Sequence, residues 1–173
     1  EGRCRGGYRA CRYPGNSHFS IFPATIFWIL LQIAGLNHYG VYQLAGYFAH
    51  IFVASVLVIL VAKKLGKIAA ITLGSSILFL GAGAENILWP FQIGAMLSLG
   101  GYLLAIYFLD SSSPRRNIWV LLALILSIGS AGFGIAVIVA ITIEMVIAKQ
   151  LLKSWWLPVV PTVGWLTWYL KYG

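Results

Sequence analysis

The longest apolar run of the chain, IWVLLALILSIGSAGFGIAVIVAITIEMVIA at residues 118–148, decides how its helices are arranged. Its 31 residues exceed the roughly 20 that one transmembrane helix needs, yet they are few for two full-length helices. The run is interrupted by Gly129-Ser130-Ala131-Gly132-Phe133-Gly134. We therefore predict two tight, half-length helices that are joined at these glycines.

The positions of the lysines and arginines favour the same hairpin. Basic residues cluster at 63–67, 110–117 and 149–153, which together hold seven of them. Cytoplasmic loops of membrane proteins carry an excess of Lys and Arg. If the three clusters share that side, an even number of crossings must separate them. The 118–148 run supplies two crossings only if it folds as a hairpin.

The composition indicates that lipid is the main solvent of the chain. Hydrophobic residues make up 60% and charged residues 9%, whereas a soluble domain carries about 25% charged residues. So few charges cannot cover a surface that faces water. The net charge of +8 does not indicate a nucleic-acid partner, because outside the first 16 residues the basic side chains lie between or at the ends of apolar runs. We expect a multi-pass protein of the plasma (inner) membrane, with the lipid bilayer as its partner.

The other apolar runs complete an all-α, polytopic transmembrane bundle of about six spanning helices. Besides the hairpin, spans are predicted at 41–62, 68–83, 90–109 and 157–170. Residues 21–36 contain Pro23 and Gln32 and are only 16 long, so they form a short span or an interfacial helix. We divide the chain into a tail at 1–16, expected to be disordered, and a transmembrane helical domain at 17–173. Both ends look cut, so we expect the chain to be part of a longer protein.

The most informative polar segment precedes the 90–109 helix. Pro90 suits the first turn of a helix and disfavours helix at Trp89, which places Glu85 in a short loop. A carboxylate at membrane depth costs about 2.5–3.5 kcal/mol on insertion scales, so it normally faces a cavity or a partner. The neighbours Asn86, Trp89 and Gln92 suit a polar cavity. The alternative is that Glu85 lies at a solvated loop tip with Trp89 as an interfacial residue.

The remaining polar residues favour structural roles. We expect Asp110 to pair with Arg115 and Arg116, Glu144 to be ion-paired or to extend toward the membrane surface, and His50 to be a buried histidine bonded to a neighbouring helix. No metal-ligand spacing joins the three histidines, and Cys4 and Cys11 lack a second pair, so no metal site is predicted. Six aromatic residues are typical of membrane-interface anchors: Trp155, Trp156, Trp165, Trp168, Tyr169 and Tyr172.

Four local patterns carry a resemblance to a known family. They are His18-Phe19-Ser20 followed by Pro23 and Gly35-Leu36; Glu85-Asn86-Ile87-Leu88-Trp89-Pro90-Phe91-Gln92-Ile93-Gly94; Ser130-Ala131-Gly132-Phe133-Gly134; and the run from Pro161 to Trp168-Tyr169. Together, over roughly residues 16–173, they resemble bacterial integral membrane glycosyltransferases of the GT-C type, which are related to protein mannosyltransferases and aminoarabinose transferases.

The resemblance implies transfer of a sugar from a polyprenyl-phosphate donor to an acceptor on the extracytoplasmic side. It implies that Glu85 is the second of two outer-loop acids and that His18 ends the first outer loop, both as catalytic residues. Asn86, Trp89, Gln92 and His38 would bind substrate. The first acid would lie upstream, so the fragment alone is expected to be inactive. The resemblance leaves open a need for a divalent metal ion, the identities of sugar, carrier and acceptor, and the oligomeric state.

Two other classes of function remain open. A glycine-interrupted hairpin is also typical of transporters and channels, in which broken helices build substrate sites. A non-catalytic membrane assembly protein would need its polar residues only for anchoring.

Overall fold

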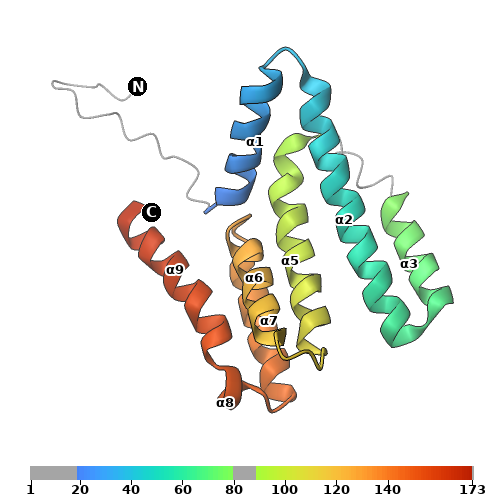
Figure 1. Ribbon diagram of the computed structural model, residues 1–173, viewed down its shortest axis with the longest axis vertical. Helices are drawn as coiled ribbons and strands as arrows, with labels where there is room; N and C mark the ends of the chain where they lie inside the picture. The colour runs from blue at the N-terminus through green and yellow to red at the C-terminus, as the bar shows by residue number, and fades with distance from the viewer. Residues whose placement is uncertain (1–18, 80–88, 173) are drawn as a thin grey trace, which may run out of the picture.

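Helices account for all the regular secondary structure in the part of the chain that the computed structural model describes, residues 19–79 and 89–172 (Figure 1). This confirms the predicted all-α class. The elements in chain order are α1 (Ile21–Ala34), α2 (Tyr39–Leu65), α3 (Lys67–Leu78), the 3-10 helix η2 (Pro90–Gln92), α5 (Ile93–Leu109), α6 (Arg116–Ile128), α7 (Gly134–Ile147), α8 (Leu151–Ser154) and α9 (Trp156–Tyr172).

Among the described helices, α2 alone has both the length and the apolar composition to cross a membrane. It contains 27 residues, about 40 Å of helix. α1, α3, α5, α6 and α7 are apolar but have 10–17 residues each.

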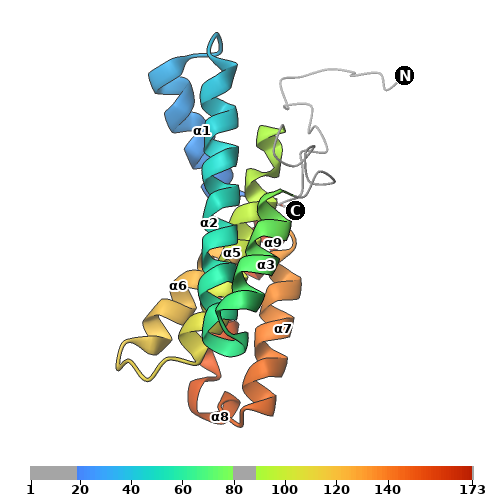
Figure 2. The same cartoon turned by 90° about the vertical axis from the view of Figure 1, so that its right-hand side faces the viewer.

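The predicted hairpin is confirmed. α6 and α7 are separate helices joined by a turn at residues 129–133. The chain enters the turn through α6 and returns through α7 toward the end of the molecule from which α6 began (Figure 2). Gly134 lies against the backbone of Ile128 so closely that a Cβ atom would overlap it. The turn therefore needs a glycine at this position to begin α7.

α5 is the central helix of the bundle and packs against α2 on one side and α6 on the other (Figure 1). Leu124, Ile141, Met145 and Leu157 are fully buried where α6, α7 and α9 meet. A second cluster, centred on Val53, joins α2 to α5. These two apolar clusters hold the helices together from both sides of α5.

Small residues let α5 and α6 approach each other closely. A Cβ atom on Gly101 would lie 2.6 Å from the carbonyl oxygen of Ala123 and 2.9 Å from the amide nitrogen of Ser127. One turn earlier, the hydroxyls of Ser98 and Ser127 lie 3.0 Å apart, fully buried, and share a hydrogen bond. Small residues and buried hydroxyl bonds at a helix contact are typical of helix pairs in membranes.

Two helices attach to α2 at its ends. Gly35, at φ 63°, turns the chain from α1 into α2, and the Tyr42 hydroxyl donates to its carbonyl at 3.0 Å. At the other end α3 folds back along α2, where Gly74 contacts the Val58 side chain. His50 of α2 bonds the carbonyl of Ile77 in α3 at 3.1 Å, which confirms the predicted role of this histidine.

The boundaries agree with the sequence in most places and differ in one. Trp89 is extended at φ −98°, ψ 105°, and Pro90 begins the helical segment, as Pro90 predicted. The helix predicted at 68–83 ends earlier than expected, since α3 ends at Leu78 and Phe79 lies in a turn. Residues 80–83 of that prediction lie outside the described residues. Hydropathy does not mark the end of α3, because Leu78 and Phe79 are both apolar. The predicted tail at 1–16 lies outside the described residues.

Candidate functional site

The segments that carried the family resemblance meet in the folded chain, beginning with α1 and the α6–α7 turn. The backbone amide of Phe22 donates a hydrogen bond to the carbonyl of Gly129 at 3.1 Å. A Cβ atom on Gly129 would lie 2.7 Å from the Phe22 ring, so glycine also makes room for that side chain. The first turn of α1 is thus held on the glycine turn by both backbone and ring contacts.

The first turn of α5 reaches the same place. A Cβ atom on Gly94 would lie 2.6 Å from the carbonyl oxygen of Ser130 and 3.2 Å from Cγ of Pro23. Ser130 is buried, and its hydroxyl donates to the carbonyl of Leu126 at 2.6 Å. We call the group formed by Phe22, Pro23, Gly94, Gly129 and Ser130 the glycine-turn junction.

α9 adds aromatic rings beside this junction. The rings of Phe19 and Trp168 lie 5.0 Å apart at an angle of 56°. Trp165 and Tyr169 stack at 5.2 Å one turn along the same helix. In Figure 1 the C-terminal part of α9 lies on the same side of the molecule as the start of α1. All four patterns noted in the sequence therefore have residues at or beside the glycine-turn junction.

The predicted site residues fall into two groups. Glu85, Asn86 and His18 lie outside the described residues. Trp89 is 63% exposed, just before η2. Gln92 is half-buried, and its side chain forms no hydrogen bond with a described residue.

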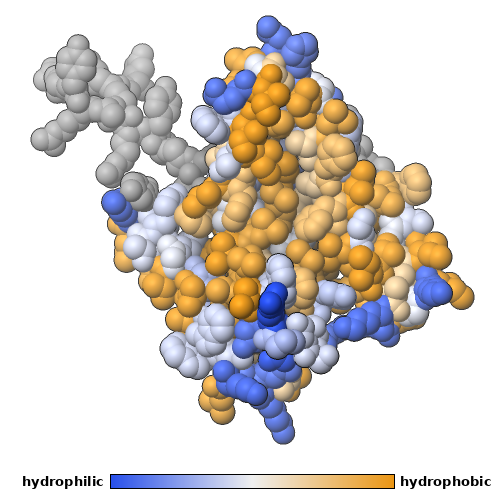
Figure 3. All heavy atoms as spheres, in the orientation of Figure 1, coloured by the Kyte–Doolittle hydropathy of each residue, from blue (hydrophilic) through white to orange (hydrophobic). Residues whose placement is uncertain are grey.

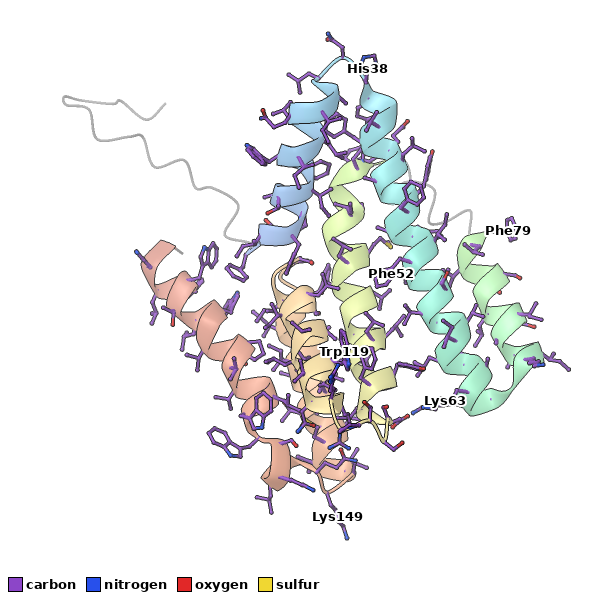
Figure 4. All side chains as sticks on the ribbon, in the orientation of Figure 1. His38, Phe52, Lys63, Phe79, Trp119 and Lys149 are labelled. Carbon is purple, nitrogen blue, oxygen red and sulfur yellow. The ribbon has the colours of Figure 1, made fainter. Side chains whose placement is uncertain are left out.

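His38 is not brought to the junction. It is exposed at the start of α2, at the upper tip of the molecule in Figure 4, and the length of α1, about 20 Å, separates this tip from Phe22. A role for His38 at the glycine-turn junction is therefore not supported by its position.

The described residues do not assemble a metal site. No group of three or more His, Cys, Asp or Glu side chains comes together within residues 19–79 and 89–172. Glu144 is exposed on α7 and forms no ion pair with a described residue. The chemistry of the junction in this part of the chain is that of backbone carbonyls, hydroxyls and aromatic rings.

The opposite end of the bundle is basic. Lys63 and Lys149 lie at the lower end of Figure 4, and Figure 3 shows hydrophilic residues gathered along the same edge. Lys64 pairs with Asp110 at 2.8 Å, and the Lys63 ammonium lies 5.1 Å from the centre of the Tyr107 ring. The three basic clusters therefore share one end, as the hairpin prediction required.

The predicted partner of Asp110 was wrong. Its carboxylate pairs with Lys64 of α2 rather than with Arg115 or Arg116, because the packing of α2 on α5 brings the ends of these helices together. Pairing with a near neighbour in sequence was the simpler expectation, but Arg116 donates to the side chain of Asn117 instead, and Arg115 forms no ion pair with a described carboxylate.

The glycine-turn junction was missed as a structural unit. The repetition of small residues at Gly94, Ser98, Gly101 and Ala105 marked the face of α5 that approaches α6, and of these four only Gly94 belongs to the junction. No protein-family model, curated protein or solved structure matches this chain.

Proposed function

We propose that this chain is the bilayer-embedded part of a multi-pass membrane protein. Soluble monomers rarely expose contiguous apolar patches larger than a few hundred Å². Here large apolar side chains on every long described helix face outward, among them Ile33 at 78%, Phe48 at 69%, Ile68 at 85% and Leu170 at 77% exposure. Figure 3 shows the apolar surface extending across the middle of the molecule. Lipid is the solvent that this surface suits.

The distribution of polar residues supports the same proposal. The seven basic residues of the three clusters lie at one end, which the positive-inside rule assigns to the cytoplasm. Trp156 begins α9 and Trp155 directly precedes it, and Trp165 and Trp168 lie toward the other end of the helix. Aromatic residues at both ends of a helix are typical of the two membrane interfaces. The glycine-turn junction then lies toward the extracytoplasmic side.

Within that frame we infer that the protein is a membrane glycosyltransferase of the GT-C type, which moves a sugar from a polyprenyl-phosphate donor to an acceptor. The observation that carries this proposal is the meeting of four sequence patterns of the resemblance at and beside the glycine-turn junction. His18 directly precedes Phe19, whose ring contacts Trp168. Glu85 precedes Trp89 by four residues, which limits their Cα separation to about 14 Å.

The chemistry assigns a role to Glu85. Attack of an acceptor hydroxyl on the anomeric carbon is helped by a carboxylate that takes the hydroxyl proton, and such a base contributes about 10²–10⁴-fold. The leaving lipid phosphate requires a cation or a metal ion at the same site. The aromatic rings of Trp89 and Trp168 offer apolar faces to the sugar or to the lipid carrier.

Replacement of Glu85 by Gln tests this role. The variant E85Q, in the native membrane protein reconstituted into proteoliposomes, should lose about 10²-fold or more of sugar transfer from radiolabelled polyprenyl-phosphate mannose or aminoarabinose. Gln keeps the size of the side chain and removes the base, so folding should not change. The rate is measured as label transferred to an acceptor fraction.

Glu144→Gln is the matched control, because it removes one exposed carboxylate from α7, away from the predicted site. It should leave transfer unchanged. Undiminished transfer in E85Q would contradict the catalytic role. Glu85-dependent uptake of a solute into the vesicles, without sugar transfer, would instead assign the protein to the transporters.

A further inference from the structure

Of the seven basic residues at the basic end of the bundle, two have their charges engaged by a described partner. Lys64 is paired with Asp110, and Lys63 lies over the Tyr107 ring. Arg116 and Lys153, by contrast, form no ion pair with any described carboxylate. These two residues are far apart in sequence, on α6 and α8, and the fold brings them to one depression.

That depression is polar and open to the outside. Its volume is about 250 Å³, and it is lined by the serines at 111–113, Pro114, Arg116, Asn117 and Lys153. The lining thus offers two positive charges, three hydroxyls and one amide, with no carboxylate. Drug-sized ligands occupy pockets of roughly 300–1,000 Å³, so this volume suits a single charged headgroup.

Side-chain hydrogen bonds hold the two walls of the depression together. The Asn117 amide nitrogen donates to the Ser154 hydroxyl at 3.5 Å, and Ser154, next to Lys153, is 1% exposed. The Arg116 Nε donates to the Asn117 side-chain oxygen at 3.3 Å. Asn117 therefore links α6 to α8 and orients the guanidinium of Arg116 at the same time.

We propose that this depression binds the phosphate of an anionic phospholipid headgroup. Phosphate oxygens accept hydrogen bonds from guanidinium, ammonium and hydroxyl groups, and the depression offers all three. The residues beside the lining are apolar and exposed: Leu152 at 94%, Trp155 at 60% and Ile118 at 55%. A phospholipid has a charged phosphate next to apolar acyl chains, which matches a polar depression next to exposed apolar residues. Free phosphate would make no contact with those apolar residues.

The position in the bilayer favours the same ligand. Anionic lipids gather in the cytoplasmic leaflet, and basic pockets between helices on that side bind their headgroups. The inference rests on the bilayer embedding proposed above and is independent of glycosyl transfer. It adds a lipid contact at the end of the bundle opposite the glycine-turn junction.

Native mass spectrometry of the full chain in detergent tests the proposal. Phosphatidylglycerol, phosphatidylcholine and inorganic phosphate are titrated in separate arms, and the bound fraction gives an apparent Kd. Wild type should bind phosphatidylglycerol in preference to phosphatidylcholine. The R116Q/K153Q variant should bind phosphatidylglycerol about tenfold more weakly, since each cation near an anionic lipid contributes several-fold.

The R115Q/K67Q variant is the matched control. It removes two exposed positive charges from the same end, and neither residue lines the depression. Its affinity for phosphatidylglycerol should change less than twofold. R116K/K153R keeps both charges and should retain binding, which attributes the loss in R116Q/K153Q to the removed charges. The thermal unfolding midpoint of R116Q/K153Q in detergent should equal that of wild type, and a lower midpoint with loss of binding in R116K/K153R as well would contradict the charge-based site.

Three results would overturn the proposal. Equal losses in R116Q/K153Q and R115Q/K67Q would show diffuse attraction by the whole basic end. Equal binding of phosphatidylglycerol and phosphatidylcholine in wild type would exclude an anionic headgroup. Displacement of the lipid by millimolar inorganic phosphate would assign the depression to a soluble phosphate compound.

Discussion

Single residues decide how closely α5 approaches α6. Gly101 faces backbone atoms of α6, which cannot rotate aside as the end of a long side chain can. One turn away, Ser98 and Ser127 form a buried hydrogen bond between their hydroxyls, where larger apolar side chains would keep the helices further apart. Close backbone contact of this kind stabilises helix pairs by van der Waals packing, without requiring water to drive it.

Gly101→Ala should destabilise the protein by about 1–3 kcal/mol, because the added methyl would force α5 and α6 apart. Thermal unfolding in detergent, followed by circular dichroism, measures the loss. Gly164→Ala on α9 is the control, since nothing lies within 4 Å of its Cβ position. It should be neutral or should stabilise by up to about 1 kcal/mol. Equal effects of the two substitutions would contradict the close contact.

At the level of elements, α3 is held on α2 by few directed contacts. His50 supplies one: since a carbonyl only accepts, its Nε2 carries the hydrogen and donates to Ile77 near the end of α3. The other ring nitrogen, Nδ1, is buried without a hydrogen-bond partner among the described residues. The side chain therefore fastens the last turn of the helix that leads toward residue 85.

His50→Leu should loosen the end of α3, because it removes the donor and retains an apolar side chain of similar size. The loss of one hydrogen bond, about 0.5–1.5 kcal/mol, should raise amide hydrogen exchange across 75–79 by roughly two- to tenfold. Exchange followed by mass spectrometry on peptides of α3 measures this. Phe48→Leu is the control, because the Phe48 side chain on α2 is 69% exposed, and it should leave the exchange across 75–79 unchanged. Unaltered exchange in H50L would show that apolar packing alone holds α3.

For the whole molecule, the arrangement of charge defines two ends. The hairpin of α6 and α7 returns the chain to the basic end before Lys149, and the pair of Lys64 with Asp110 joins two further helix ends there. The tip between α1 and α2, with Asn37 and His38, lies at the opposite extreme (Figure 4). An embedded bundle with this shape has its basic end on one side of the bilayer.

Single cysteines test this orientation in a background with Cys4 and Cys11 replaced by Ser. Lys67→Cys, Ser112→Cys and Lys149→Cys should react with a membrane-impermeant maleimide from the same side. Asn37→Cys should react from the other side. Labelling in right-side-out and inside-out vesicles measures the access of each position. Access from one side for all four positions would contradict a bundle that crosses the bilayer.

Local patterns were sufficient to predict the helical class, the start of the 90–109 segment at Pro90 and the hairpin at the glycines. Each of these predictions depends only on residues close in sequence. Proline lacks an amide hydrogen, glycine interrupts a helix, and lysines at helix ends are enriched on the cytoplasmic side of membrane proteins. The role of His50 was also predicted, because a polar ring in the middle of an apolar helix needs a partner from another helix. The catalytic assignment to Glu85 and His18 remains a proposal.

Only the tertiary structure decided which distant residues meet. The sequence by itself determined where the helices lie, because turn residues and apolar runs act over a few positions. It could not select Lys64 over Arg115 for Asp110, join Phe22 to Gly129, or bring Arg116 and Lys153 to one depression. Those contacts depend on how α1, α2, α5, α6 and α8 pack, and packing is a property of many side chains acting together.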